Sequence, residues 1–296
     1  MEDQANKGER IAKIIARAGL ASRRESEKLI LDGKVKVNGK TISSPALNLS
    51  SDDVVEVDGK LLSPPEKTRI WMYHKPVGLI STSKDEKNRP TIFDKLPNEM
   101  PRVLSIGRLD LNSEGLLLLT NDGELKRRLE LPSTGWLRSY RVRVKGRLNE
   151  NMLEPLRRGI SVDGTQFKPM QVSFDRQTGA NAWLSIGLRE GKNREIRKAL
   201  SLLGLSVNRL IRISFGDFEL GKLKKGEIEE VRSSIVKTLF KKEVDNREMK
   251  ENQKGNFGRK GTKNKEKVSI TRNVSKNRRF NHCLLYTSDA ADDSQC

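Results

Sequence analysis

The chain has 296 residues, enough for two domains or for one domain with appended segments. Its hydrophobic residues, at 34%, barely outnumber its charged residues, at 33%, which predicts that part of the chain lies outside any folded core. The formal net charge of +19 favours an extended polyanion as partner, either a nucleic acid or an anionic membrane surface.

Motifs that the sequence lacks exclude several classes of protein. The polar start "MEDQANKGER" has no signal-peptide core, and no apolar run approaches the roughly 20 residues that span a bilayer. The only cysteines are Cys283 and Cys296, and the only histidines are His74 and His282, so neither a disulfide framework nor a paired-cysteine zinc site is expected. We therefore expect a cytoplasmic protein that binds nucleic acid and does not bind a metal.

Residues 9–62 are predicted to form a small basic module. Ile11, Ile14 and Ala18 recur at helical spacing and predict a first helix. The segment "ASRRESEKLILDG" predicts a second helix, which begins at an S-x-x-E capping box and ends at its glycine. In "KVKVNGKTIS" the valines alternate with lysines up to an Asn-Gly pair, a strong hairpin signal.

The cations of this module are clustered and of one sign, which favours contacts with nucleic-acid phosphates over an ordinary solvated face. The candidate RNA-binding residues in the module are Arg10, Lys13, Arg17, Arg23, Arg24 and Lys36.

After a linker at residues 63–68, residues 69–232 are predicted to be an α+β domain with a mixed, mainly antiparallel sheet. "SYRVRVKG" and "AWLSIGLRE" alternate apolar and polar residues, as half-buried strands do, and the first has a basic outer face. "NREIRKALSLLG" predicts a helix with Asn193 as N-cap and Gly204 as stop.

Residues 233–280 hold 15 Lys and Arg against 5 Asp and Glu, and are predicted to form a disordered basic tail. Residues 281–296, "NHCLLYTSDAADDSQC", break this pattern, because they have no Lys or Arg and contain both cysteines. We interpret this end as non-native, since it resembles translated adapter sequence.

Two further motifs favour structural roles. "GDFELGKL" has the spacing of a phosphate-binding P-loop, but it ends in Leu223 where Ser or Thr should hold magnesium, and it lies in a predicted hairpin. His74 has no second histidine or cysteine at ligand spacing, so a metal site there is not expected.

The segment "GRLDLNSEGLLLLT", residues 107–120, places a charge pair before four leucines. In an extended chain Arg108 and Asp110 share one face and Leu109 lies on the other. Spacing alone leaves two interpretations, a salt bridge at a strand end or a carboxylate that acts as nucleophile or base.

This segment resembles the signature of the RsuA/RluB/RluE/RluF family of ribosomal RNA pseudouridine synthases. "YHKPVGLISTSKDEKNRPTIFDKLP" before it and "EGKNREIRKALSLLGLSVNRLIRISFGDFEL" after it resemble the same family in the same order. The basic module is similar to the S4 RNA-binding domain of these enzymes, so the resemblance covers roughly residues 9–232. The basic tail is most like that of the large-subunit member.

The resemblance implies the site residues. Asp110 matches the catalytic aspartate, Tyr140 the tyrosine that stacks on the target base, and Arg197 the basic residue that pairs with the aspartate. Arg108, Asn193 and Arg194 are then expected to contact RNA, although helical spacing alone does not choose between Arg194 and Arg197. Plain structural roles remain open for Tyr140, as a core residue of its strand, and for Arg197, as an exposed helix residue.

The implied function is isomerisation of one uridine in ribosomal RNA, with 23S RNA or an assembling ribosomal particle as the expected partner, by a monomer without a cofactor. One alternative is a 16S enzyme of the same family, and another is a non-catalytic assembly factor that uses the S4 module. A membrane-surface protein is disfavoured, since no long basic amphipathic helix with aromatic anchors is present.

Overall fold

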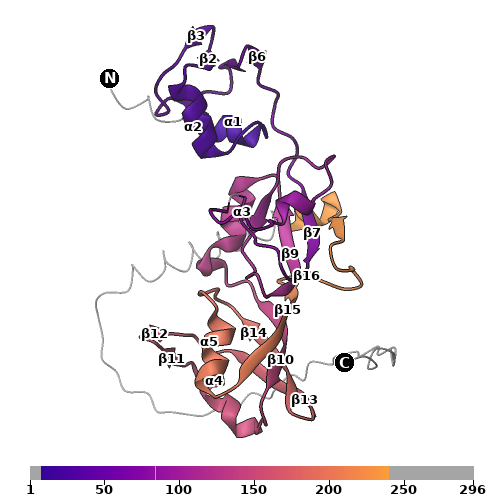
Figure 1. The fold of residues 1–296 in the computed structure, drawn as a ribbon. Helices are drawn as coiled ribbons and strands as arrows, with labels where there is room; N and C mark the ends of the chain where they lie inside the picture. The colour runs from indigo at the N-terminus through magenta and orange to yellow at the C-terminus, as the bar shows by residue number, and fades with distance from the viewer. Residues whose placement is uncertain (1–7, 84, 240–296) are drawn as a thin grey trace, which may run out of the picture. The chain divides into compact units, whose positions relative to one another are not determined.

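The computed structural model describes residues 8–83 and 85–239, which form a small N-terminal module and a larger α+β domain (Figure 1). The module has two helices, a four-stranded sheet of order β3-β2-β5-β6, and a separate pair β1-β4. Its elements are β1 (Glu9–Arg10), α1 (Ile11–Arg17), α2 (Arg23–Leu31), β2 (Val35–Val37), β3 (Lys40–Thr41), β4 (Asn48–Leu49), β5 (Val55–Val57) and β6 (Lys60–Leu61).

Local signals in the module form the predicted structures. The Ser22 hydroxyl accepts from the backbone N–H of Glu25, whose carboxylate accepts from the N–H of Ser22, so the capping box is present. Asn38 and Gly39 both have positive φ, 49° and 78°, as a two-residue hairpin turn between β2 and β3 requires.

The buried stripe of α1 differs from the predicted one. Ile11, Ala12 and Ile15 are buried, whereas Ile14 is only partly buried and Ala18 is the C-cap. Two overlapping apolar stripes fit this seven-residue helix, and packing against the sheet, through Val35 and its neighbours in the core, selects one of them.

The larger domain is built on a nine-stranded sheet of order β13-β14-β10-β15-β9-β7-β17, with β16 paired to β15 and β8 paired to β9. Every pairing is antiparallel except that of β15 with β9. The mixed, mainly antiparallel sheet is therefore confirmed. Its strands are β7 (Ile70–Lys75), β8 (Leu104–Ile106), β9 (Glu114–Thr120), β10 (Arg138–Lys145), β13 (Gln171–Thr178), β14 (Asn181–Leu188), β15 (Ser206–Phe215), β16 (Phe218–Glu219) and β17 (Ile228–Glu230), and a small hairpin adds β11 (Ser161–Val162) and β12 (Thr165–Gln166).

The helices pack against this sheet (Figure 1). They include α3 (Gly123–Glu130), α4 (Glu154–Arg158) and α5 (Glu195–Leu202), with the 3₁₀ turns η1 (Phe93–Lys95), η2 (Pro132–Thr134) and η3 (Glu150–Leu153). Leu156 of α4 and Ile196 of α5 belong to one core cluster with Val142 and Leu184, while Leu125 of α3 belongs to a second.

The four consecutive leucines lie in β9, all seven residues of which are buried. Leu117 and Leu119 enter the first core cluster, and Leu116 and Leu118 enter the second. A strand covered on both sides has no polar face, which explains a continuous apolar run.

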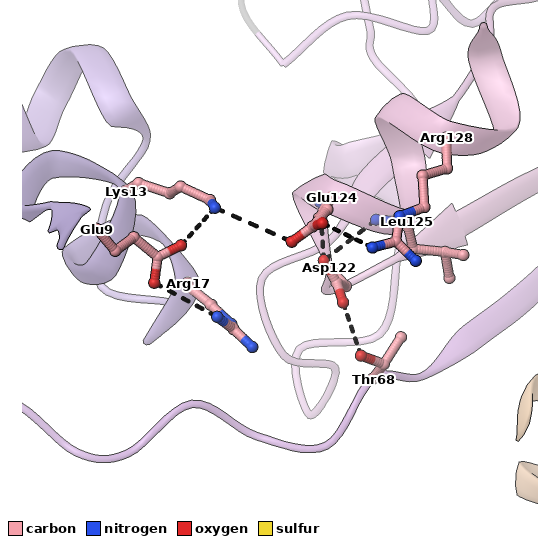
Figure 2. Close-up of polar contacts among 8 residues, drawn as sticks. All are labelled: Glu9, Lys13, Arg17, Thr68, Asp122, Glu124, Leu125 and Arg128. Carbon is pink, nitrogen blue, oxygen red and sulfur yellow. Dashed lines mark hydrogen bonds and ion pairs between the residues drawn. The ribbon is translucent and has the colours of Figure 1, made fainter. Parts of the chain in front are cut away.

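The helix α3 is fixed at its start by Asp122, whose carboxylate accepts from the N–H groups of Glu124 and Leu125, at 2.8 and 3.2 Å, and from the hydroxyl of Thr68 (Figure 2). Thr68 ends the predicted linker, so its last residue is tied to the folded domain. The hydrogen bond also explains part of the lowered pKa of the Asp122 carboxyl, which its burial opposes.

The folded chain continues past residue 232, where the disordered tail was predicted to begin. Residues 233–239 are helical, and Val236 and Leu239 are buried in the second core cluster. These two side chains are three residues apart and form the apolar face of a helical turn. The count of charged residues, on which the predicted tail was based, does not detect such spacing. The remainder of the predicted tail, residues 240–280, and the terminal segment 281–296 lie outside the described residues.

The P-loop-like motif lies in the hairpin of β15 and β16 and the turn after it, as expected from its alternation. His74 is buried, and its Nδ1 lies 2.7 Å from the carbonyl oxygen of Leu223, a structural hydrogen bond. In the described part of the chain, no helix is long and apolar enough to cross a membrane.

Candidate active site

A cleft of about 470 Å³ lies between the loop after β8, the start of β10 and the segment that leads into α5. Its lining brings together every residue that was predicted for the catalytic domain: Arg108, Asp110, Tyr140, Asn193, Arg194 and Arg197. Seven Lys and Arg against four Asp and Glu line the cleft, which gives it the positive balance that a nucleic-acid substrate requires.

Asp110 lies in the loop between β8 and β9. Arg108 and Asp110 are exposed and Leu109 is buried between them, so the predicted alternation is confirmed. The hydroxyl of Ser81 forms two hydrogen bonds with the backbone of Leu109. It donates to the carbonyl oxygen at 3.0 Å and accepts from the N–H at 3.2 Å. Gly107 donates its N–H to the carboxylate of Glu130, at 2.7 Å.

The side chain of Lys75 fixes the other half of the same loop through hydrogen bonds to its backbone. Its side chain is fully buried, and its ammonium group donates to the carbonyl oxygens of Pro76, Asp110 and Ser113, at 3.0, 3.1 and 2.8 Å. Burial lowers the pKa of this amine to about 8, although the charges of Asp110 and Glu114 oppose the shift. The backbone of Asp110 is thus fixed while its carboxylate stays accessible.

Tyr140 lies on the buried face of β10, directly opposite Ile186 on one side and Arg212 on the other. Arg212 is 2% exposed; its Nε donates to the carbonyl oxygen of Leu116 at 2.7 Å, and its Nη2 is buried without a partner among the described residues. The tyrosine therefore forms part of the cleft on a rigid strand beside a buried cation.

Arg197 does not form the predicted direct ion pair with Asp110. Its guanidinium donates to the carbonyl oxygens of Val207 and Asn112, at 3.1 and 2.8 Å. Asn112 belongs to the Asp110 loop, so Arg197 supports that loop through its backbone. The two charges still interact, because burial lowers the pKa of Arg197 and the Asp110 charge raises it.

The predicted N-cap of α5 is also displaced by one residue. Arg194, with φ 50° and ψ 32°, is the N-cap and has no side-chain capping bond, whereas Asn193 precedes it. The carboxylate of Glu195 instead accepts from the N–H of Lys192, at 3.1 Å, and closes this turn. Both Asn193 and Arg194 are exposed on the cleft.

Two carboxyl groups, Glu190 and Glu195, lie together at the edge of the cleft, and both are buried. Burial, and then the hydrogen bond to Glu190, raise the pKa of Glu195 to about 8. Glu190 keeps a lowered pKa despite its burial, because the N–H of Lys168 and the ammonium of Lys192 bond to it. Burial and the neighbouring carboxyl group thus favour the protonated form of Glu195 in the folded protein.

The cations predicted for the N-terminal module are on its surface. Glu9 forms ion pairs with two of them, Lys13 and Arg17 (Figure 2). The other four are exposed and make no ion pair within the described residues: Arg10, Arg23, Arg24 and Lys36.

Lys75, Glu195 and Arg212 are site residues that sequence reasoning missed. For Lys75, the available signal was a charged residue at the end of an otherwise apolar strand pattern, "IWMYHK". Such a residue has to be satisfied inside the protein. Among the described residues, no three His, Cys, Asp or Glu side chains gather where they could hold a metal ion.

Comparison with known families identifies both parts of the chain. A model of RNA pseudouridylate synthases matches residues 69–202, and a model of the S4 domain matches residues 9–55. An uncharacterized RNA pseudouridine synthase of Rickettsia felis is 48% identical over 228 residues, which are 77% of this chain and 99% of that protein.

A ribosomal large subunit pseudouridine synthase B of Yersinia pestis is 40% identical over 221 residues, covering 73% of this chain and 70% of the relative. A crystal structure of a pseudouridylate synthase superposes with a TM-score of 0.55 at 27% identity, over 77% of this chain and 98% of that one. The chain therefore belongs to the family of RNA pseudouridine synthases, which isomerise uridine to pseudouridine in RNA, and it carries an S4 domain before its catalytic domain.

Proposed function

We propose that this enzyme isomerises one specific uridine of 23S ribosomal RNA and that Asp110 is its catalytic carboxylate. The observation that carries the proposal is the convergence of Asp110, Tyr140 and Arg197 from three distant segments on one positively charged cleft. A salt bridge at a strand end, the other interpretation of Asp110, has less support, because its carboxylate forms no ion pair within the described residues.

The reaction breaks the bond between the ribose C1′ and N1 of uracil and forms a bond from C1′ to C5. The C5 proton leaves and N1 gains one, so no oxidant, reductant or water is consumed. Asp110 acts as the nucleophile or base in detaching the base, and its exposed carboxylate on a fixed backbone suits either role. Tyr140 stacks on the flipped base, which offsets part of the few kcal/mol that unstacking costs.

Arg197 supports the Asp110 loop and supplies positive charge close to the carboxylate. Arg108, Asn193 and Arg194 line the cleft with exposed side chains, and we assign them to the nucleotides that flank the target. In the S4 domain the phosphate contacts are the four cations that form no ion pair within the described residues, while Lys13 and Arg17 share Glu9 and contribute less.

The choice of 23S RNA is supported by the name of the Yersinia pestis relative, a large-subunit enzyme. We further propose that the enzyme acts as a monomer in the cytoplasm, where ribosomal particles are assembled.

The proposal is tested by mapping pseudouridine across 16S and 23S RNA in a strain that lacks the gene. We expect one 23S position to lose its modification, to regain it with the wild-type gene and not with Asp110→Asn. Loss of a 16S position would reassign the substrate, and complementation by Asp110→Asn would contradict the catalytic assignment.

A further inference from the structure

The outward face of the sheet formed by β13, β14, β10 and β15 carries a row of arginines around one tryptophan. Arg143 lies directly opposite Trp183 on β14 and opposite Arg209 on β15, and Trp183 lies opposite Arg176 on β13. Partners in an antiparallel pair share a face, so one residue from each of four strands stands in this row. Arg143, Arg176 and Arg209 are exposed and Trp183 is partly exposed.

This face is distinct from the active-site cleft. Tyr140 and Val142 of β10 point to the buried face, where Tyr140 lines the cleft, whereas Arg141 and Arg143 alternate with them and point outward. The guanidinium of Arg141 lies 4.8 Å from the centre of the Trp183 ring, so the second arginine of β10 joins the same patch. The outward face and the cleft are therefore two sides of one sheet.

The charges of this face have little compensation. Arg209 forms an ion pair with the buried carboxylate of Glu114, which also binds Lys225. Asp175 bonds to the hydroxyl of Ser185, at 3.0 Å from each oxygen. Arg143 and Arg176 form no ion pair within the described residues.

Stability of the sheet does not account for this arrangement. Like charges directly opposite each other, as Arg143 and Arg209 are, destabilise a strand pair. Charge on an edge strand prevents edge-to-edge pairing, which explains Arg176 on β13. It does not explain Arg143, because β10 lies between two strands.

We propose that this face is a second RNA-binding surface, which holds an RNA segment other than the one that carries the target uridine. Adjacent strands are about 4.8 Å apart, so the row from Arg176 to Arg209 spans about 14 Å, enough for several phosphates of one strand. An aromatic side chain among cations on an open sheet is also how protein sheets stack unpaired RNA bases. The enzyme thereby recognises a folded RNA domain and not only the RNA segment that enters the cleft.

The inference rests on the proposed RNA substrate, and two RNAs test it: a short RNA segment that carries the mapped uridine and the folded RNA domain that contains this segment. Binding of each is measured against salt for the wild type, for the double variant Arg143→Gln/Arg176→Gln and for the control Arg158→Gln. Arg158 is an exposed arginine on α4, with a side chain 82% exposed. Thermal unfolding confirms that each variant is folded.

For the folded domain, we expect the slope of log K against log salt to flatten by about 1.4 to 1.8 in the double variant, roughly 0.7 to 0.9 for each lost phosphate contact. For the short segment, the slope of the double variant should stay at the wild-type value, and Arg158→Gln should keep the wild-type slope on both RNAs. An unchanged slope of the double variant on the folded domain, or an equal flattening on the short segment, overturns the inference. If the double variant binds both RNAs like the wild type but no longer associates with ribosomal particles, the face binds an acidic protein instead. This result also overturns the inference. Product formation by the wild type on the same RNAs reports separately on the proposed function.

Discussion

Lys75 is a buried cation whose three N–H groups meet three carbonyl oxygens, two of them in the loop that carries Asp110. As pH rises through the pKa of about 8, the amine loses a proton and has two N–H groups left for three acceptors. The loop should then be held less firmly, and a small misplacement of a catalytic group is costly.

Replacing Lys75 with Met should therefore lower turnover about 10- to 100-fold, because it removes every hydrogen bond of this amine. The parent enzyme should lose turnover on the alkaline side with an apparent pKa of about 8, and Lys75→Met should lack this inflection. Since Glu195 titrates in the same range, both profiles are recorded in a Glu195→Gln background. An identical alkaline limb in the two enzymes would rule out Lys75 as its cause.

Glu195 gives a separate prediction, for stability. Its pKa is raised from 4.5 to about 8 in the folded state, so the folded protein retains a proton that the unfolded chain releases near pH 4.5. Its stabilising contribution is thus complete below pH 4.5 and is lost as pH rises through about 8.

Glu195→Gln, which keeps a hydrogen-bond donor toward Glu190 and cannot ionise, should show a higher Tm than the parent at about pH 8 and a similar Tm near pH 4.5. Thermal unfolding from about pH 4.5 to 9 measures the difference, with exposed Glu27→Gln as the matched control. Parallel curves for parent and Glu195→Gln would contradict the raised pKa of Glu195.

At the scale of elements, Gly115 allows β9 and β15 to pair in parallel beside the site. Its φ is 107°, and a Cβ at this position would lie 2.3 Å from the carbonyl oxygen of Arg212. Gly115→Ala should therefore destabilise the domain by about 2–6 kcal/mol, from backbone strain and overpacking together.

Gly164→Ala is the matched control, because Gly164 has φ 72° but no atom lies within 4 Å of the place that a Cβ would take. It should cost only the strain, about 1–3 kcal/mol. Urea unfolding compares the two, and equal losses would show that the close approach of β15 to Gly115 is unimportant.

Elements with local signals could be predicted from the sequence, and long-range contacts could not. The capping box of Ser22, the turn at Asn38 and the alternation of β10 depend on neighbouring residues, and all three were predicted correctly. The positions of Arg197 and Glu195 depend on which distant carbonyl or carboxyl groups the fold brings near them. The resemblance predicts Asp110 as the catalytic carboxylate, but only the fold shows how Lys75 holds its loop.

At the scale of the whole molecule, the end of the folded chain can be tested by two truncations. Removing residues 240–296 leaves Val236 and Leu239 in the core, whereas removing residues 233–296 deletes both. The protein that ends at residue 239 should keep the wild-type free energy of unfolding. In the protein that ends at residue 232, this free energy should fall by at most about 2–5 kcal/mol per deleted core side chain.

Residues 240–280 contain 14 Lys and Arg against 5 Asp and Glu. Removing residues 240–296 should therefore lower RNA affinity and flatten its dependence on salt, because fewer counterions are released. A salt slope equal to that of the full chain would exclude these residues from the binding surface.

The most direct test of the central claim, that Asp110 performs the chemistry in the cleft, uses RNA labelled with tritium at C5 of uridine. Purified wild type should release tritium as C5 loses its proton, and Asp110→Asn should release none while it binds the same RNA with nearly wild-type affinity. Release by Asp110→Asn at the wild-type rate would contradict the account.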